Sequence, residues 1–176
     1  MTETLRGQLL VAAPILSDPN FRRTVVLVAE HGEEGAMGLV LNRPTDTPVG
    51  EALPELSPIA GEAEPVYLGG PVAIGSVLAV AELDDPDDAS ELLFGAVGFV
   101  QELDVPVVRG RVFVGYAGWS AGQLEAELEE ESWLVLPAEA DDLFSDDPDG
   151  LWSTVLRRQG GPYALLSLMP VDPSLN

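Results

Sequence analysis

The segment Gly118-Trp119-Ser120-Ala121-Gly122 has the G-x-S-x-G spacing that presents a serine nucleophile between a strand and a helix. Such a serine needs a histidine base, and the only histidine, His31, precedes it, whereas α/β-hydrolases place their histidine after the serine. A chain with 18 glycines also produces this five-residue pattern readily by chance. We therefore favour a glycine-rich entrance to a helix, and we assign no catalytic residue.

Metal-ligating patterns are equally weak. His31 is the only imidazole, and it falls in a polar segment expected to be a hairpin loop, where a solvated or capping role is favoured. Asp147 and Asp149 fit positions three and five of a calcium loop, but position one is Ser145 and position twelve is Leu156. The acidic runs are best interpreted as solvated faces. The sequence predicts no metal site and no cofactor.

A polar pair stands where a buried strand is expected to meet a turn. Asn42 and Arg43 are followed there by Pro44, and loop residues at such a position commonly bind ligands. The alternative for Arg43 is a structural salt bridge to one of the 30 acidic residues. Both residues are kept as binding candidates.

The charge balance restricts the class of partner. The chain has 30 acidic residues and only eight basic residues, all of them arginine, and its formal net charge is -22. Because DNA-binding proteins gain affinity by replacing counterions with Lys and Arg at the phosphates, this charge argues against a nucleic-acid partner. The absence of cysteine removes disulfides and Cys-based zinc sites.

Neither a membrane span nor a signal peptide is expected. The longest uncharged run, residues 65–81, is shorter than the roughly 20 residues of a spanning helix, and four glycine or proline residues interrupt it. We interpret it as two buried strands. The apolar stretch of residues 9–16 lacks a basic segment before it. A cytoplasmic location without membrane contact is predicted.

Strand and helix patterns alternate along the whole chain. Turn clusters separate short β-branched runs, which predict strands over residues 9–13, 24–30, 37–41, 66–68, 76–81, 92–101, 111–114, 133–136 and 163–169. The first three form an antiparallel meander. Amphipathic periodicity predicts a helix from Ser120 and another from Asp149 to Gly160, and Thr47-Pro48 opens a short helix that Pro54 or Pro58 ends. The prediction is a single α+β domain, residues 1–176, with a mixed, mainly antiparallel sheet and a few packed helices.

The segment of residues 115–125 joins a predicted strand to a predicted helix through three glycines. These glycines allow close approaches that a side chain would block, so one rigid shape is expected. The first helical turn leaves amide donors that can attract an anion or be capped by Ser120. Trp119 either closes a pocket or packs the helix onto the sheet, and we predict a buried Trp119 beside a partly exposed Gln123.

Several separated motifs together resemble one family. They are, in order, Ala13-Pro14 with Asp18-Pro19-Asn20-Phe21, Gly38-Leu39-Val40-Leu41-Asn42-Arg43-Pro44, Gly69-Gly70-Pro71-Val72, Gly115-Tyr116-Ala117-Gly118-Trp119 with Gly122-Gln123-Leu124-Glu125, and Asp172-Pro173-Ser174-Leu175-Asn176. The chain resembles the AlgH/YqgE family of bacterial proteins over nearly its full length. The resemblance implies a one-domain α+β fold, a cytoplasmic location and a regulatory label without agreed catalytic residues.

The function predicted from the sequence is therefore non-catalytic binding or regulation, with a protein or a small molecule as the partner. An enzyme of unrecognised type and a DNA-binding regulator are the alternatives, and the latter has no visible helix-turn-helix or basic patch. The candidate ligand-binding or partner-binding residues are Asn42, Arg43, Gly69, Gly70, Tyr116, Trp119 and Gln123.

Overall fold

The computed structural model describes residues 4–16, 18–19 and 21–168. All ten strands of the described chain join in one sheet. Eight of them follow the order β10-β1-β2-β3-β9-β6-β8-β7, while β5 pairs with β9 and β4 pairs with β5. The strands are β1 (Gln8–Ala12), β2 (Val25–Gly32), β3 (Gly35–Val40), β4 (Pro44–Pro48), β5 (Pro65–Leu68), β6 (Val72–Leu83), β7 (Glu91–Phe94), β8 (Val97–Phe99), β9 (Val107–Ser120) and β10 (Trp133–Pro137). Only the pairing of β5 with β9 is parallel among these strands, so the predicted mixed, mainly antiparallel α+β class is confirmed.

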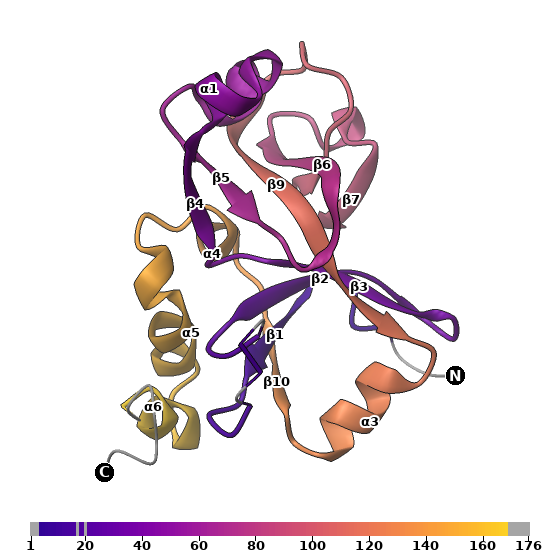
Figure 1. Ribbon diagram of the computed structural model, residues 1–176, viewed down its shortest axis with the longest axis vertical. Helices are drawn as coiled ribbons and strands as arrows, with labels where there is room; N and C mark the ends of the chain where they lie inside the picture. The colour runs from indigo at the N-terminus through magenta and orange to yellow at the C-terminus, as the bar shows by residue number, and fades with distance from the viewer. Residues whose placement is uncertain (1–3, 17, 20, 169–176) are drawn as a thin grey trace.

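Short helices lie at the borders of this sheet (Figure 1). They are α1 (Val49–Ala52), α2 (Ser57–Ala60), α3 (Gln123–Glu129), α4 (Ala140–Leu143), α5 (Leu151–Gln159) and α6 (Pro162–Leu166), with 3-10 turns at Pro54–Leu56, Pro86–Asp88 and Pro148–Gly150. The short helix predicted after Thr47-Pro48 is α1, which ends before Pro54. The helix predicted before Gly160 is α5, whose buried face is formed by Leu151, Trp152, Val155 and Leu156.

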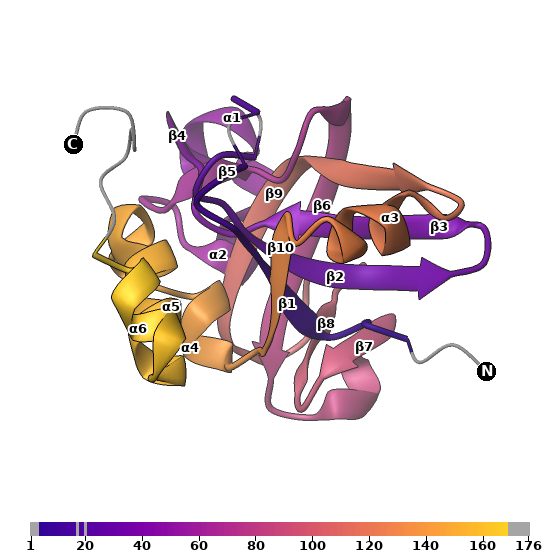
Figure 2. The same ribbon diagram turned by 90° about the horizontal axis from the view of Figure 1, so that it is seen from below.

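Successive side chains of the β1–β2–β3 meander point to opposite faces of the sheet and contribute to two hydrophobic cores. In β1, Leu9 and Val11 pack with Trp152 and other residues of α5 on one face of the sheet. Leu10 and its neighbours on the opposite face pack with Leu124 of α3. Successive residues of a strand point to opposite faces, so a run of apolar residues is buried on both sides only if helices cover both. Figure 2 shows α5 and α6 on one side of β1 and β2, and α3 near the end of β3 and β9.

The strand β9 is longer than the sequence predicts. A strand over residues 111–114 was expected, but β9 continues to Ser120 because residues 117–120 pair with β3. Helix α3 consequently begins at Gln123 rather than at Ser120, with Gly122 as its N-cap residue. Gly115 and Gly118 thus lie within β9, and the pairing of β9 with β3 fixes the shape of this segment.

Two other predictions of secondary structure are wrong. Residues 92–101 are not one strand but the hairpin β7–β8, which turns at Gly95 with φ of 52°. Of the strand predicted over residues 163–169, residues 163–166 instead belong to helix α6, residues 167–168 form a turn after it, and residue 169 lies outside the described residues. Pro162 at the first turn of α6 presets a helical φ, and Ala and Leu favour helix, so this apolar run fits helix better than strand.

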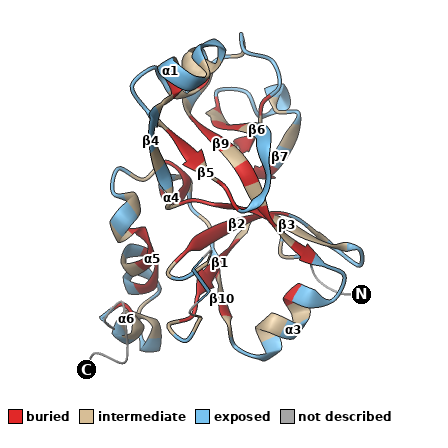
Figure 3. Cartoon of the chain, viewed as in Figure 1, coloured by how far each residue is buried: buried red, intermediate tan, exposed pale blue. Residues whose placement is uncertain are grey.

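The uncharged run is only partly buried. Residues 66–67 are buried in β5, as expected, but residues 72–77 at the start of β6 are all exposed. Figure 3 shows this part of β6 in pale blue beside the buried centre of the sheet. The exposed segment, residues 72–77, therefore contradicts the prediction of two buried strands.

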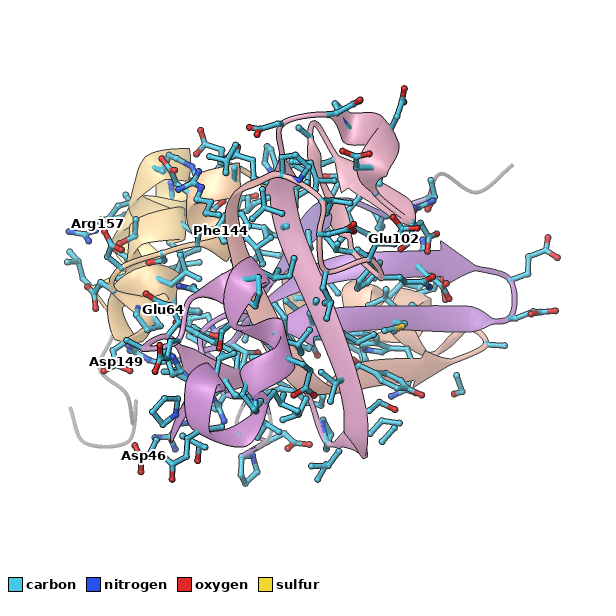
Figure 4. All side chains as sticks on the ribbon, turned by 90° about the horizontal axis from the view of Figure 1, so that it is seen from above. Asp46, Glu64, Glu102, Phe144, Asp149 and Arg157 are labelled. Carbon is cyan, nitrogen blue, oxygen red and sulfur yellow. The ribbon has the colours of Figure 1, made fainter. Side chains whose placement is uncertain are left out.

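Exposed carboxylates occur on many elements of the fold. Asp46, Glu64, Glu102 and Asp149 are exposed on different elements, and Figure 4 shows them spread around the sheet. Within the described ranges, no helix is both long enough and apolar enough to cross a membrane.

Candidate functional site

An aromatic cluster fixes α3 to the sheet. The Trp119 ring lies 6.2 Å from that of Phe21 and 5.9 Å from that of Trp133. Both indole N–H groups donate to Oε1 of Glu127 on α3, at 3.0 Å from Trp119 and 2.8 Å from Trp133. Gln123 donates to the other oxygen of Glu127 at 2.9 Å. Trp119 is buried, as predicted, while Gln123 is exposed, and the tryptophan packs the helix onto the sheet.

Ser120 is held by its neighbour rather than by a base. Its backbone N–H and its hydroxyl both lie within hydrogen-bonding distance of Gln123 Oε1, at 3.0 and 3.2 Å. The expectation that Ser120 caps α3 is therefore wrong, because Gly122 occupies the N-cap position. The first turn of α3 also carries the acidic Glu125, which disfavours an anion at this N-terminus.

His31 is structural. Its position is in β2 rather than in a loop, and its side chain is 5% exposed. The backbone N–H of Leu5 donates to Nδ1 at 3.0 Å, so the ring proton lies on Nε2, which donates to Glu125 Oε1 at 2.7 Å. This hydrogen bond lowers the pKa of the Glu125 carboxyl. Both ring nitrogens are thus engaged in tying the N-terminal segment and α3 to β2.

We expect fluorophosphonate probes to leave Ser120 unlabelled. The hydroxyl contacts an amide oxygen, and His31 is committed to Leu5 and Glu125, so no general base activates this serine in the described structure. Intact-protein mass spectrometry, with a serine hydrolase labelled in parallel, checks this. Stoichiometric labelling that disappears in Ser120→Ala would instead make the protein a hydrolase.

Asn42 and Arg43 organise the loop between β1 and β2. The Asn42 amide donates to Arg23 O at 2.9 Å, and its oxygen accepts from Val25 N–H at 3.1 Å. The Arg43 guanidinium donates to Arg22 O at 2.9 Å. Burial, assisted by the nearby Arg22 charge, lowers the pKa of Arg43. Both predicted site residues therefore make structural contacts to backbone groups.

Gly69 and Gly70 are buried where the β5–β6 connection crosses β9. A Cβ atom on Gly69 would lie 2.4 Å from Gly115 O, and one on Gly70 would lie 2.1 Å from the carbonyl carbon of Tyr116. Gly70 also has φ of 156°. The glycine motif therefore permits two backbones to approach, and its contacts explain folding rather than ligand binding.

Of the predicted site residues, Tyr116 and Trp119 line an open depression of about 500 Å³ beside the β2–β3 hairpin. Glu30, Glu34 and Met37 of that hairpin line it on one side, and Val72 of β6 on the other. Val72 pairs with Tyr116 in the sheet. This depression is thus formed where the β2–β3 hairpin, the end of β9 and the start of β6 meet.

A second depression of about 370 Å³ adjoins the first. It shares Glu30 and Met37 with the first and adds Val77 and Leu78 of β6, with Phe99 of β8. We call the two together the β6 groove. The exposed segment, residues 72–77, runs from one depression to the other, because Val72 lines the first and Val77 the second.

The exposed segment has an irregular backbone. Val72 pairs with Tyr116 and Val77 pairs with Val114, so four residues of β6 oppose only Gly115 of β9. Ala73 has φ of 49°, and Ile74 projects with 59% exposure. On its other side, β6 pairs with β8 only at residues 80–82. A bulged strand of this kind re-aims its side chains and leaves part of its edge open.

Acidic side chains border the groove. Glu30 and Glu34 line the first depression, and no ion pair involves either of them among the described residues. Glu91 of the second depression is paired with Arg6 at 2.9 Å. The apolar floor therefore has a negatively charged border.

A third cleft, of about 470 Å³, contains two cations but does not resemble an anion site. Arg111 is buried there, donates to Leu143 O at 2.8 Å and lies 4.3 Å from the centre of the Tyr67 ring. Arg109 pairs with Glu82 and Asp141 at 3.0 and 2.8 Å. Since internal partners satisfy both guanidinium groups, this cleft holds the α4 segment on the sheet.

Sequence reasoning missed most of the groove. Val72 and Tyr116 belong to the motifs, but Glu30, Met37 and Val77 were not singled out. The only signal is the uncharged run of residues 65–81, which the sequence predicts to form two buried strands. Among the described residues, no group of three or more His, Asp or Glu side chains is arranged to hold a metal ion.

Comparisons with known proteins agree on one family. Residues 9–164 match the family model described as AlgH-like. The UPF0301 protein SCO2948 of Streptomyces coelicolor is 47% identical over 192 residues, which cover 100% of this chain and 98% of the relative. The crystal structure of protein DIP2367 from Corynebacterium diphtheriae has a TM-score of 0.84 at 32% identity, covering 94% of this chain and 93% of that one. The solution structure of the AlgH protein from Pseudomonas aeruginosa has a TM-score of 0.72 at 32% identity, covering 97% and 98%.

Proposed function

We propose that this chain, which belongs to the AlgH-like family, is a non-catalytic binding protein that holds a protein partner in the β6 groove. The observation that carries the proposal is the exposed segment, where Val72, Ile74 and Val77 are 38%, 59% and 41% exposed on a bulged strand. A shallow, apolar and open surface suits a protein partner, whereas small molecules and catalysis favour enclosed pockets.

The same proposal assigns roles to the predicted site residues. Tyr116 contributes to the floor of the groove, and Trp119 with Gln123 holds α3 in place beside it. Gly69 and Gly70 act indirectly, because they permit the strand crossing that positions β6 against β9. Asn42 and Arg43 stabilise the loop between β1 and β2. A cytoplasmic location remains part of the proposal and is supported by the cysteine-free sequence.

Substitution of Ile74 tests the proposal. We expect Ile74→Asp to abolish affinity capture of a partner from native lysate, because a charge would enter the apolar surface of the interface. Val108→Asp is the matched control, since Val108 is also 59% exposed but lies outside both the groove and the exposed segment, residues 72–77. Both variants should retain wild-type stability within about 0.5 kcal/mol, as usual for exposed positions.

Quantitative mass spectrometry of the captured proteins decides the outcome. Recovery of a protein by the wild type and by Val108→Asp, but not by Ile74→Asp, supports the proposal. Equal recovery of every captured protein by all three would place the interface elsewhere and contradict it.

A further inference from the structure

The charge around the β6 groove specifies the chemistry of its partner. Glu30 and Glu34 flank the apolar floor formed by Met37, Val72 and Tyr116. Both carboxylates are exposed, and neither takes part in an ion pair among the described residues. In the described part of the chain, no Lys or Arg lines either depression of the groove. A partner with cations beside an apolar anchor would complement this surface.

The backbone of β6 specifies the conformation of the partner. Residues 73–76 stand outside the ladder with β9, and the pairing of β6 with β8 is limited to residues 80–82. An open strand edge next to an apolar groove is the arrangement that accepts an added strand, with main-chain hydrogen bonds on one side and alternate side chains in the groove.

Building on the proposed function, we infer that the β6 groove binds an extended, cationic segment of a partner protein. Its apolar residues contact Met37, Val72 and Tyr116, while Arg or Lys side chains on the same segment reach Glu30 and Glu34. A second copy of this chain is a poor candidate, because each copy has a net charge of -22 and no lysine.

The test is an NMR titration of the full-length, ¹⁵N-labelled protein with blocked octapeptides. The probe alternates Arg and Val, and the controls alternate Ser and Val or Glu and Val. We expect saturable shifts at the amides of Met37, Val72, Ile74 and Val77 with the Arg–Val probe, and much smaller shifts with either control. Acidic residues are spread over the surface, so a cationic peptide is attracted to many places on it. The informative readouts are therefore whether the amide shifts are confined to the groove and whether they saturate.

Two double variants distinguish the effect of charges at the groove from the effect of the net charge of the protein on binding of the probe. Glu30→Gln/Glu34→Gln should weaken the affinity of the protein for the Arg–Val probe about three- to tenfold, as expected for the loss of two exposed ion pairs. Glu129→Gln/Glu130→Gln removes the same charge from exposed positions on and just after α3 and should leave the affinity unchanged. All four substitutions are at exposed positions, and the amide spectra check that the variants are folded.

Each other outcome overturns the inference. Diffuse, unsaturable shifts, or equal weakening by both double variants, would mean that only net charge attracts the probe. Equal binding of the Ser–Val probe would leave an apolar groove without cation preference, and the proposed function would stand. Absence of binding by every probe would exclude an extended segment, and the Ile74→Asp capture experiment would then judge the proposed function independently. Self-association detected by light scattering would make the second copy the occupant.

Discussion

Replacement of Trp119 by alanine should lower the free energy of unfolding by about 3–5 kcal/mol, the usual loss for a buried tryptophan. The side chain is 6% exposed and packs against the rings of Phe21 and Trp133. Its indole N–H also donates to Glu127 of α3 at 3.0 Å. The variant removes the Trp119 contribution to the packing between α3 and the sheet, while Leu124 and Trp133 still connect the two. Equilibrium denaturation in urea measures the effect.

The stability of Trp119→Phe is compared with that of Trp119→Ala. Phenylalanine keeps a six-membered aromatic ring but removes the five-membered ring of the indole together with its N–H donor, while Glu127 still accepts from Trp133 and Gln123. A loss of about 2 kcal/mol, for one hydrogen bond and part of the buried ring, is therefore expected. If Trp119→Ala cost less than this, Trp119 would not hold α3 on the sheet, and its main role would be contact with the partner.

Replacement of Gly70 by alanine should destabilise the protein by about 3 kcal/mol or more, because steric overlap and backbone strain act together. The new Cβ atom would lie 2.1 Å from the carbonyl carbon of Tyr116 and 2.3 Å from Ala117 N. These are backbone atoms of β9, which pairs with neighbours on both sides and cannot move away easily. The φ of 156° adds strain for any residue with a side chain.

Gly75→Ala, in the exposed segment of β6 that follows this connection, provides the control. A Cβ atom at Gly75 meets no atom within 4 Å, so its free energy of unfolding should stay within about 0.5 kcal/mol of the wild type. Thermal and urea denaturation of both variants give the comparison. Similar stability of Gly70→Ala and Gly75→Ala would show that the crossing of β9 tolerates a side chain and would remove the structural explanation of the glycine pair.

The parts of the fold that were predicted correctly have local signals. Residues 25–28 are consecutive β-branched or aliphatic residues at the start of β2, and helix α5 has an apolar face and a glycine, Gly160, at its C-cap. Helix α6 was mistaken for a strand because a five-residue apolar run fits either element, and only Pro162 at its start favours the helix.

The groove could not be predicted, because its parts are distant in sequence. Met37, Val77 and Phe99 meet only through the pairing of β3 and β6 with β9 and of β8 with β6. The seven predicted candidates were selected from motifs, and motifs mark close backbone approaches as readily as binding surfaces. Gly69 and Gly70 illustrate the first case, and Tyr116 lies on the surface proposed for binding. Exposure of residues 72–77 is a tertiary property that an apolar sequence does not reveal.

The most direct test of the binding role of the β6 groove is site-specific photo-crosslinking in cells of the native organism. A photoreactive amino acid is placed at Ile74 in one variant and at Val108 in the other, two positions with the same 59% exposure. We predict a discrete adduct with one partner protein from Ile74 and none from Val108, with the crosslinked partner peptide containing Arg or Lys beside apolar residues. An identical adduct pattern from both positions, or adducts from Val108 alone, would contradict the proposal that this groove is the binding site.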